Sequence, residues 1–186
     1  LETTAAFTSK TPTWRIDFET QNDTMQVVET LQDDETRNVE FDLSQIIVPD
    51  GYRIGYIEAV VTSEEVEGIS GQCDSVAADI IENELTAQWD NQRNNLSGQD
   101  SSCVPIDLDL VVYPDYYGES LEVSAMNEYQ ALLNWTQDGW GDGILSIDLD
   151  LDVNAPLGFD PIGSDTDEEI TVDVTVIMFS VSIQEI

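Results

Sequence analysis

The sequence predicts an all-β protein, an antiparallel β-sandwich of the jelly-roll or Ig-like type with one short helix. Short segments in which apolar and polar residues alternate are separated by Gly, Pro, Asn and Asp, which is typical of such sandwiches. Hydrophobic residues make up 41% of the 186 residues, enough for one packed core. We therefore expect a single domain over 13–186, preceded by an N-terminal arm over 1–12.

Strands are expected along the first half of the chain wherever every second residue is apolar. The segments 13–19 and 38–43 alternate in this way, and 24–31 reads as a further strand that ends in the acidic turn at 33–36. Pro49, Asp50 and Gly51 form a strong turn signal before a long strand.

Helical spacing appears in one later segment, from which we predict a short helix near 125–137. Its apolar residues are Met126, Tyr129, Leu132 and Leu133, with Ser124 as the expected cap and Gly139 as the end. The segment 75–89 fits either a helix or a strand, and we favour a strand.

The last segment, 169–184, changes the parity of its apolar residues. Ile170 to Val176 share one parity, whereas Ile177 to Ile183 share the other. Because a two-residue period cannot change faces without a bulge or bend, we expect a long strand that bulges or crosses between the sheets. The alternative is a strand whose second face is covered by a neighbouring molecule.

Charge is the strongest compositional signal. The chain has 39 acidic residues, one Lys, four Arg and no His, for a net charge of −34. Such a field repels nucleic acid and anionic membranes, and it is tolerated best in concentrated salt. No apolar run reaches transmembrane length, so we expect no direct membrane insertion of this chain.

Two cysteines and three sequons favour an exported protein. A Cys73–Cys103 disulfide would close a loop worth roughly 3–4 kcal/mol in the chain-entropy model. Asn-X-Ser/Thr sequons mark Asn22, Asn95 and Asn134 as candidate glycosylation sites.

Acidic residues also raise the question of Ca²⁺, which prefers oxygen ligands in turns. The candidate metal residues lie in two loops, DGWGDG and FDPIGSDTDEE, and are Asp138, Asp142, Asp160, Asp165 and Asp167. Two ladders, Asp107/Asp109 and Asp148/Asp150, instead suit the solvated faces of strands, because successive outward residues lie about 6.5–7 Å apart. No cofactor is expected apart from this candidate Ca²⁺.

Aromatic residues beside acids give a candidate sugar-binding surface. These residues are Tyr113, Tyr116, Tyr117 and Trp140, and their alternative role is to close the ends of the core. The absence of His and the expected pairing of both cysteines remove most nucleophilic mechanisms, so we expect no enzymatic activity.

Several of these features together resemble the acidic exported β-sandwich surface proteins of marine or halophilic archaea. They are Cys73 and Cys103, the YPDYYGES loop, the helix after it and the DGWGDGIL turn, and the resemblance spans about the C-terminal two thirds of the chain. It implies a surface location and transfers no site residue.

The leading hypothesis is a non-enzymatic, glycosylated structural or adhesive protein of an archaeal cell surface. It would self-associate or bind a surface or glycan partner, and as a pilus-like fibre subunit it would exchange strands, with 1–12 as the donor. The alternative is a Ca²⁺-dependent carbohydrate-binding module, and a carboxylate-pair glycosidase is a more remote one.

Overall fold

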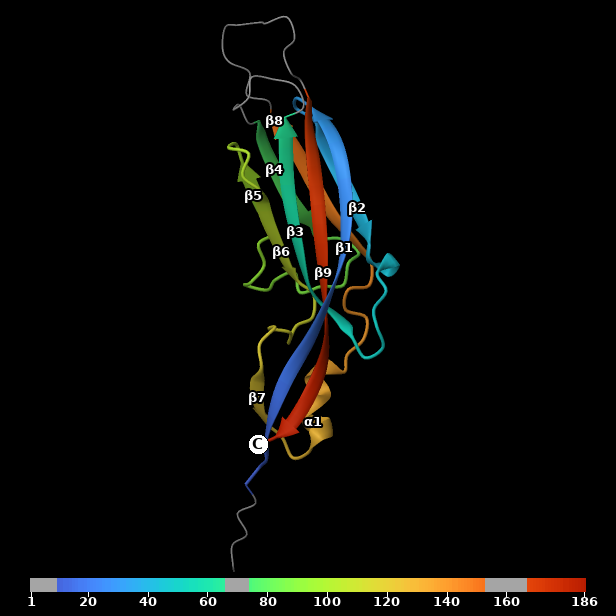
Figure 1. Cartoon of the computed structure of the whole chain (residues 1–186), viewed down its shortest axis with the longest axis vertical. Helices are drawn as coiled ribbons and strands as arrows, with labels where there is room; N and C mark the ends of the chain where they lie inside the picture. The colour runs from blue at the N-terminus through green and yellow to red at the C-terminus, as the bar shows by residue number, and fades with distance from the viewer. Residues whose placement is uncertain (1–9, 66–73, 153–166) are drawn as a thin grey trace, which may run out of the picture.

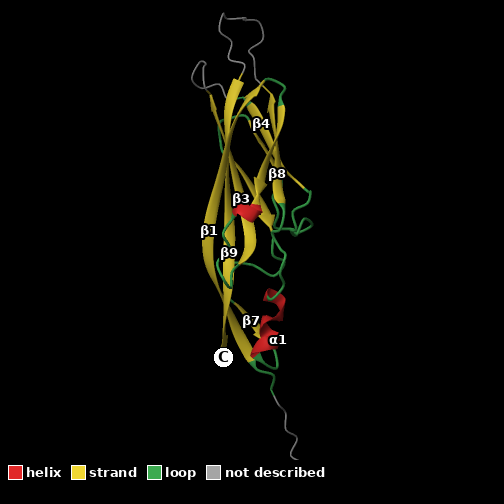
Figure 2. Cartoon of the chain, turned by 90° about the vertical axis from the view of Figure 1, so that its right-hand side faces the viewer, coloured by secondary structure: helices red, strands yellow, loops and turns green. Residues whose placement is uncertain are grey.

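The computed structural model describes residues 10–65, 74–152 and 167–186, which form an elongated two-layer β-sandwich (Figure 1). The first sheet has the order β6-β3-β9-β1-β7, and the second has the order β2-β8-β4-β5. Figure 2 shows β1, β3 and β9 in one layer and β4 and β8 in the other. The bounds of the strands are β1 Thr13–Gln32, β2 Thr36–Asp42, β3 Arg53–Glu65, β4 Ser75–Ile81, β5 Ser97–Asp100, β6 Ile106–Val111, β7 Leu121–Ser124, β8 Ile144–Asp152 and β9 Asp167–Glu185.

The strand pairing is that of a jelly roll. Four antiparallel pairs, β1–β9, β2–β8, β3–β6 and β4–β5, are nested within one another along the chain. The additional pairs β3–β9 and β4–β8 roll this long hairpin into two sheets. The structure therefore confirms the predicted antiparallel sandwich and, of the two topologies considered, has the jelly roll.

The core lies between the two sheets and follows the predicted alternation. The second sheet contributes Val39, Phe41 and Leu43 from the β2 region and, beside them, Leu145, Ile147, Leu149 and Leu151 of β8. The first sheet contributes the even-numbered apolar residues of β9, and all of these are buried. Ile106, Leu108 and Leu110 of β6 close the other side. Most polar residues between them are exposed or partly exposed, whereas Ser146 of β8 is buried.

A second, smaller core lies below the sandwich. Ile16, Tyr113, Tyr116, Trp135 and Phe179 form it, and β7, α1 (Glu128–Leu132) and the 3₁₀ turn η2 (Leu133–Trp135) lie beside it. We call this end of the molecule, together with the parts of β1 and β9 that reach it, the foot. The opposite end, with the β1–β2 turn and the end of β8, is the tip (Figure 1).

The parity change in the last strand has a different cause from the predicted one. β9 stays in one sheet, and its register with β1 is unbroken from Trp14↔Glu185 to Gln32↔Asp167. The bulge lies in β3 instead, where Gly55 is the extra residue between Ile54 and Tyr56. The β1–β9 ribbon buries one face against the second sheet and the other face in the foot, so the chain itself covers both faces.

The predicted helix is present, but it is shorter than predicted and buries a different face. It spans α1 and η2, and the side chain of Asn127 rather than Ser124 caps it by accepting a hydrogen bond from the Gln130 N–H at 2.9 Å. Ala131 and Trp135 are buried, whereas Met126 and Tyr129 are 64% and 71% exposed. Of the four apolar residues at helical spacing, only Leu132 packs against the core, because the helix is too short to present one stripe across three turns.

Segment 75–89 contains the favoured strand, β4, followed by a loop. Two strands, β5 and β7, lie in segments without a strand signal in the sequence. In the part of the chain that the structure describes, no helix has the length and apolar character needed to cross a membrane.

Candidate functional site

The two acidic ladders lie on opposite sheets and face solvent. Asp107 and Asp109 are on β6 of the first sheet, whereas Asp148 and Asp150 are on β8 of the second. Asn38 donates to Asp148 at 2.7 Å, and Thr36 donates to Asp150 at 2.9 Å. These neutral donors take up part of the negative charge, and the ladders do not combine into one site.

The DGWGDG turn is held by its backbone. Gly139, Gly141 and Gly143 all have positive φ angles, and a Cβ at Gly143 would lie 2.7 Å from the Glu84 carbonyl oxygen. The backbone of this turn exchanges two hydrogen bonds with Thr86, at 2.8 and 2.9 Å. These contacts explain why the turn needs glycine, and they place Asp138, Trp140 and Asp142 around one small cavity.

This cavity, the Arg53 pocket, has a volume of about 170 Å³ and is lined by Tyr52, Arg53, Gln137, Asp138, Trp140 and Asp142, among others. Arg53 donates from Nε to the Gln137 carbonyl at 3.0 Å and from Nη2 to Asp138 at 3.2 Å. The Trp140 indole N–H donates to Gln137 Oε1 at 3.1 Å. Three predicted site residues thus converge here with Arg53 and Tyr52, which no motif in the sequence marks as site residues.

The predicted sugar-binding tyrosines divide into core and surface. Tyr113 is fully buried, donates to the Asn134 carbonyl at 2.9 Å and accepts from the Gln137 N–H at 3.1 Å. Tyr116 stacks on Phe179 with centroids 4.6 Å apart, and burial raises the pKa of both phenols. Their burial excludes both rings as sugar platforms, which corrects that prediction.

Tyr117 is different, since 57% of its surface is exposed. The Arg93 guanidinium lies over its ring, 4.6 Å from the centroid, and donates to the Tyr116 carbonyl at 2.7 Å. One face of Tyr117 is therefore already covered by a cation of this chain.

The candidate metal residues fall in three places. Asp138 and Asp142 line the Arg53 pocket, where Arg53 already pairs with Asp138. Asp160 and Asp165 lie outside the described residues, and Asp167 opens β9 opposite Gln32. The described residues do not bring the two predicted loops together around an ion site.

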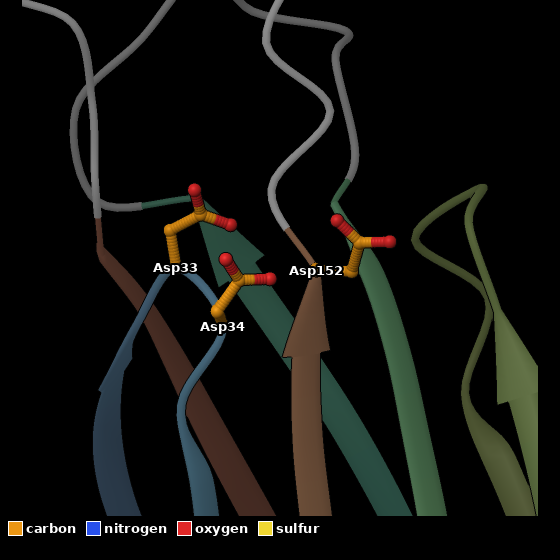
Figure 3. Close-up of side chains that lie close together, drawn as sticks. All are labelled: Asp33, Asp34 and Asp152. Carbon is orange, nitrogen blue, oxygen red and sulfur yellow. The ribbon is translucent and has the colours of Figure 1, made fainter.

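A different acidic cluster forms at the tip, where Asp33, Asp34 and Asp152 gather (Figure 3). Their carboxylate oxygens lie within 4.8 Å of one another, and all three residues are exposed. Local sequence patterns do not reveal this cluster, because Asp152 reaches the β1–β2 turn only through the pairing of β2 with β8. Exposed acidic groups are frequent on a chain of this charge, and the cluster alone does not identify a metal site.

The Cys73–Cys103 pairing and the glycosylation of the three sequons remain predictions. Cys103 is disulfide-bonded, and Cys73, the only other cysteine in the chain, lies outside the described residues. Asn22, Asn95 and Asn134 are all exposed, as glycosylation requires. The amide of Asn95 donates to the Asp107 carbonyl at 2.6 Å, so a glycan at this position would have to replace that hydrogen bond.

The outer edge of β1 is the longest open edge in the described part of the fold. β7 pairs with β1 only from Thr13 to Ile16, so no described strand pairs with the outer edge from Asp17 to Gln32. Between Thr20 and Val28 the sole charged residue is Asp23, and Val28 is 48% exposed. Sheet edges are usually protected by charge or cover, and this stretch has little charge. Cover from the described residues comes only at its end, where β2 lies nearby and Arg37 pairs with Glu29 at 2.8 Å.

Comparison with known proteins gives no family. No protein-family model matches the chain, and no curated protein matches it. A crystal structure of the decameric BFDV capsid protein is similar over 87% of this chain and 99% of that one, with 10% identity and a TM-score of 0.47. A nora virus structure is similar over 87% of this chain and 60% of its own, with 9% identity and a TM-score of 0.34. These likenesses are too distant to carry a functional argument, so function has to be inferred from the chain itself.

Proposed function

We propose that this chain is a non-enzymatic structural protein that self-associates through the open edge of β1. The observation that carries the proposal is the edge from Asp17 to Gln32, which runs beside the unbroken β1–β9 ribbon without a partner strand in the described structure. An extended segment from a second copy would continue the first sheet there and satisfy the outward-facing backbone groups.

The charge distribution along this edge supports a second copy as the partner. In a chain with 39 acidic residues, the stretch Thr24–Val28 contains none. Like charges directly opposite each other destabilise strand pairs, so an uncharged stretch is where two copies of so acidic a protein pair with the least repulsion. The exposed side chain of Val28 adds apolar surface to that contact.

The residue inventory supports a non-enzymatic role. The chain has no His, and Cys103 is tied in a disulfide, which removes the usual nucleophile and base. The Arg53 pocket, with a volume of about 170 Å³, is a concave site where acidic and aromatic residues meet, and Arg53 already neutralises Asp138 there.

The N-terminal arm, 1–12, is the proposed donor strand. Its end is anchored in the foot, because Ala125 N–H donates to the Pro12 carbonyl at 3.2 Å and the Trp14 indole donates to the Ala125 carbonyl at 3.0 Å. The arm carries the apolar residues Ala5, Ala6 and Phe7. Its point of departure is thus fixed to the same strand whose edge is open.

The proposal extends to the setting of the protein. The net charge of −34, the disulfide-bonded Cys103 and the exposed sequon residues support a glycosylated protein outside the cell, at an archaeal surface in saline surroundings. In such a setting, salt confines the repulsion between copies to about 3 Å at 1 M.

The test is self-association in concentrated salt, measured by sedimentation velocity and electron microscopy. In about 2 M NaCl, we expect wild-type protein to form oligomers or fibres. Thr24→Glu/Val28→Glu, which places two acids on the edge, should raise the dissociation constant at least about tenfold, equal to about 1.4 kcal/mol. Deleting 1–9 should have the same effect if the arm is the donor.

The matched control is Ile47→Glu, since Ile47 is 84% exposed and lies in the β2–β3 loop rather than on β1. We expect it to associate like the wild type. A protein that is strictly monomeric in salt, or whose association is unaffected by both the edge variant and the deletion, would overturn the proposal.

A further inference from the structure

The Arg53 pocket has the composition of a recognition site that self-association does not use. We infer that this pocket binds one sugar ring of a neutral glycan. The inference is independent of the proposed function, because the pocket lies between the β2–β3 loop and the DGWGDG turn rather than on the edge of β1.

The pocket offers the groups that a sugar ring requires. Tyr52 and Trp140 are partly exposed aromatics that can face the C–H groups of a pyranose. Arg53 retains N–H donors beyond the two that it uses internally, and the carboxylates of Asp138 and Asp142 accept hydrogen bonds from hydroxyls. Donors, acceptors and an apolar surface thus lie around one cavity of about 170 Å³.

The charge of the pocket selects a neutral ligand. Arg53 is paired with Asp138, and Asp142 adds a second negative charge to the lining. An acidic sugar would meet this carboxylate and the field of a chain with a net charge of −34. A neutral sugar ring is repelled neither by this carboxylate nor by the net charge of the chain.

The geometry is preorganised. Arg53 is only 28% exposed in its side chain and is held by Gln137 and Asp138, while the amide of Gln137 also accepts the Trp140 indole N–H. The turn beneath is close-packed, because a Cβ at Gly141 would lie 2.9 Å from Ile54. Binding therefore loses little free energy to ordering of the site.

Size limits the ligand to one ring and the affinity to a weak one. The cavity is smaller than the roughly 300 Å³ at which drug-sized ligand pockets begin. A single hexose in so small a site is therefore expected to bind with a dissociation constant in the millimolar range. Repeated sugars on a surface and repeated copies of the protein would raise the avidity.

Saturation-transfer NMR with the full chain tests this assignment, using the methyl glycosides of glucose, mannose and galactose, and N-acetylglucosamine. We expect at least one to bind at about 1–10 mM with transfer to its ring protons, unchanged by EDTA. Asp138→Asn alters a side chain that is 90% exposed and leaves folding intact, and Arg53→Gln removes the central donor; each should weaken binding at least about fivefold.

The control is Arg15→Gln, which removes another arginine paired with an exposed aspartate, here Asp17 at 3.0 Å. It should bind like the wild type. The assignment is overturned if none of the four sugars binds at about 50 mM, if EDTA abolishes binding, or if Asp138→Asn binds as tightly as the wild type.

Discussion

At the scale of single residues, neighbours in the sequence have opposite roles. Tyr116 is 6% exposed and stacks on Phe179, whereas Tyr117 is 57% exposed and lies under Arg93. Both are tyrosines in one loop, so their composition alone does not distinguish a core ring from a surface ring. Which ring enters the foot is decided by the path of the backbone after β6.

Tyr56, on β3, provides a prediction at this scale. Burial, followed by the charge and hydrogen bond of Asp109, raises its pKa to about 12. The unfolded phenol ionises near pH 10. The folded state therefore retains a proton that the unfolded state loses, and stability should fall as pH rises from about 10 to 12.

The measurement is thermal unfolding at pH 9 to 12, with phenol ionisation followed by ultraviolet absorbance. Tyr56→Phe should lose less stability over this interval than the wild type, whereas Tyr129→Phe, on exposed α1, should behave like the wild type. Tyr113 and Tyr116, whose pKa values burial also raises, contribute in the same direction and leave a residual drop. Equal losses in Tyr56→Phe and wild type would contradict the prediction.

At the scale of elements, the β1–β9 ribbon is the feature that organises the molecule. Its strands are 20 and 19 residues long, whereas strands of about 3–10 residues are usual. Leu31 and Val174 are buried in the sandwich, and Ile16 and Phe179 in the foot, on the opposite face of the ribbon. One pair of strands therefore connects two cores.

Ile16→Ala should loosen the foot more than the sandwich. Ile16 is fully buried opposite Ile183, and its truncation should cost about 2–5 kcal/mol. Because this residue packs only in the smaller core, we expect hydrogen exchange to accelerate first in the amides of 13–18 and of β7. Hydrogen exchange, measured by mass spectrometry or NMR, should accelerate less in β8, which belongs to the sandwich.

Val174→Ala is the matched variant, since Val174 is equally buried but lies in the sandwich half of the same strand pair. It should accelerate exchange in the sandwich strands. If both variants accelerate exchange uniformly over the whole chain, the two cores form one cooperative unit and the distinction fails.

At the scale of the whole molecule, repulsion among the 39 acidic residues opposes folding in addition to the entropy of the chain. Strand pairing places carboxylates directly opposite each other, Glu58 with Asp109, Asp79 with Asp148 and Glu64 with Glu169. Such pairs destabilise a sheet in dilute buffer, where the Debye length is about 10 Å at 0.1 M, and much less at 1 M, where it is about 3 Å.

The melting temperature should accordingly rise steeply with NaCl between about 0.1 and 2 M. In dilute buffer, Asp79→Asn should raise the free energy of unfolding by roughly 0.2–1 kcal/mol and raise the melting temperature accordingly. This gain should vanish at high salt. Asp50→Asn, in the exposed β2–β3 turn, should change little at either concentration. A melting temperature independent of salt, or a destabilising Asp79→Asn in dilute buffer, would show that repulsion between carboxylates does not limit stability.

Much of the fold was predictable because burial imposes a period of two on the strands. The alternation in 13–19 corresponds to buried Ile16 between partly buried Trp14 and Phe18, and that in 38–43 to buried Val39, Phe41 and Leu43. The turn at Asp50 and Gly51 lies where it was expected. β5 was missed because its residues, SGQD, are polar; Gly98 is needed there because a Cβ would lie 2.4 Å from Ile106. β7 was missed because it is only four residues long.

The candidate site was predictable only in part. The composition of their loop points to Asp138 and Asp142 as candidates for binding an ion and to Trp140 as a candidate for binding a sugar. It does not predict that the three residues line one pocket. Nothing in the sequence points to Arg53 and Tyr52, because they come from the start of a strand far away along the chain. Likewise, nothing local in the sequence joins Asp152 to Asp33 and Asp34.

The sequence by itself determined the class of this protein: an acidic β-sandwich with one short helix and no His. These properties follow from composition and local periodicity, which neighbouring residues encode. Only the tertiary structure decided the jelly-roll order, the two faces of the ribbon, the open edge of β1 and the assembly of the Arg53 pocket. Each of these depends on pairing between strands distant in the chain, and the alternation of apolar residues is compatible with many such pairings.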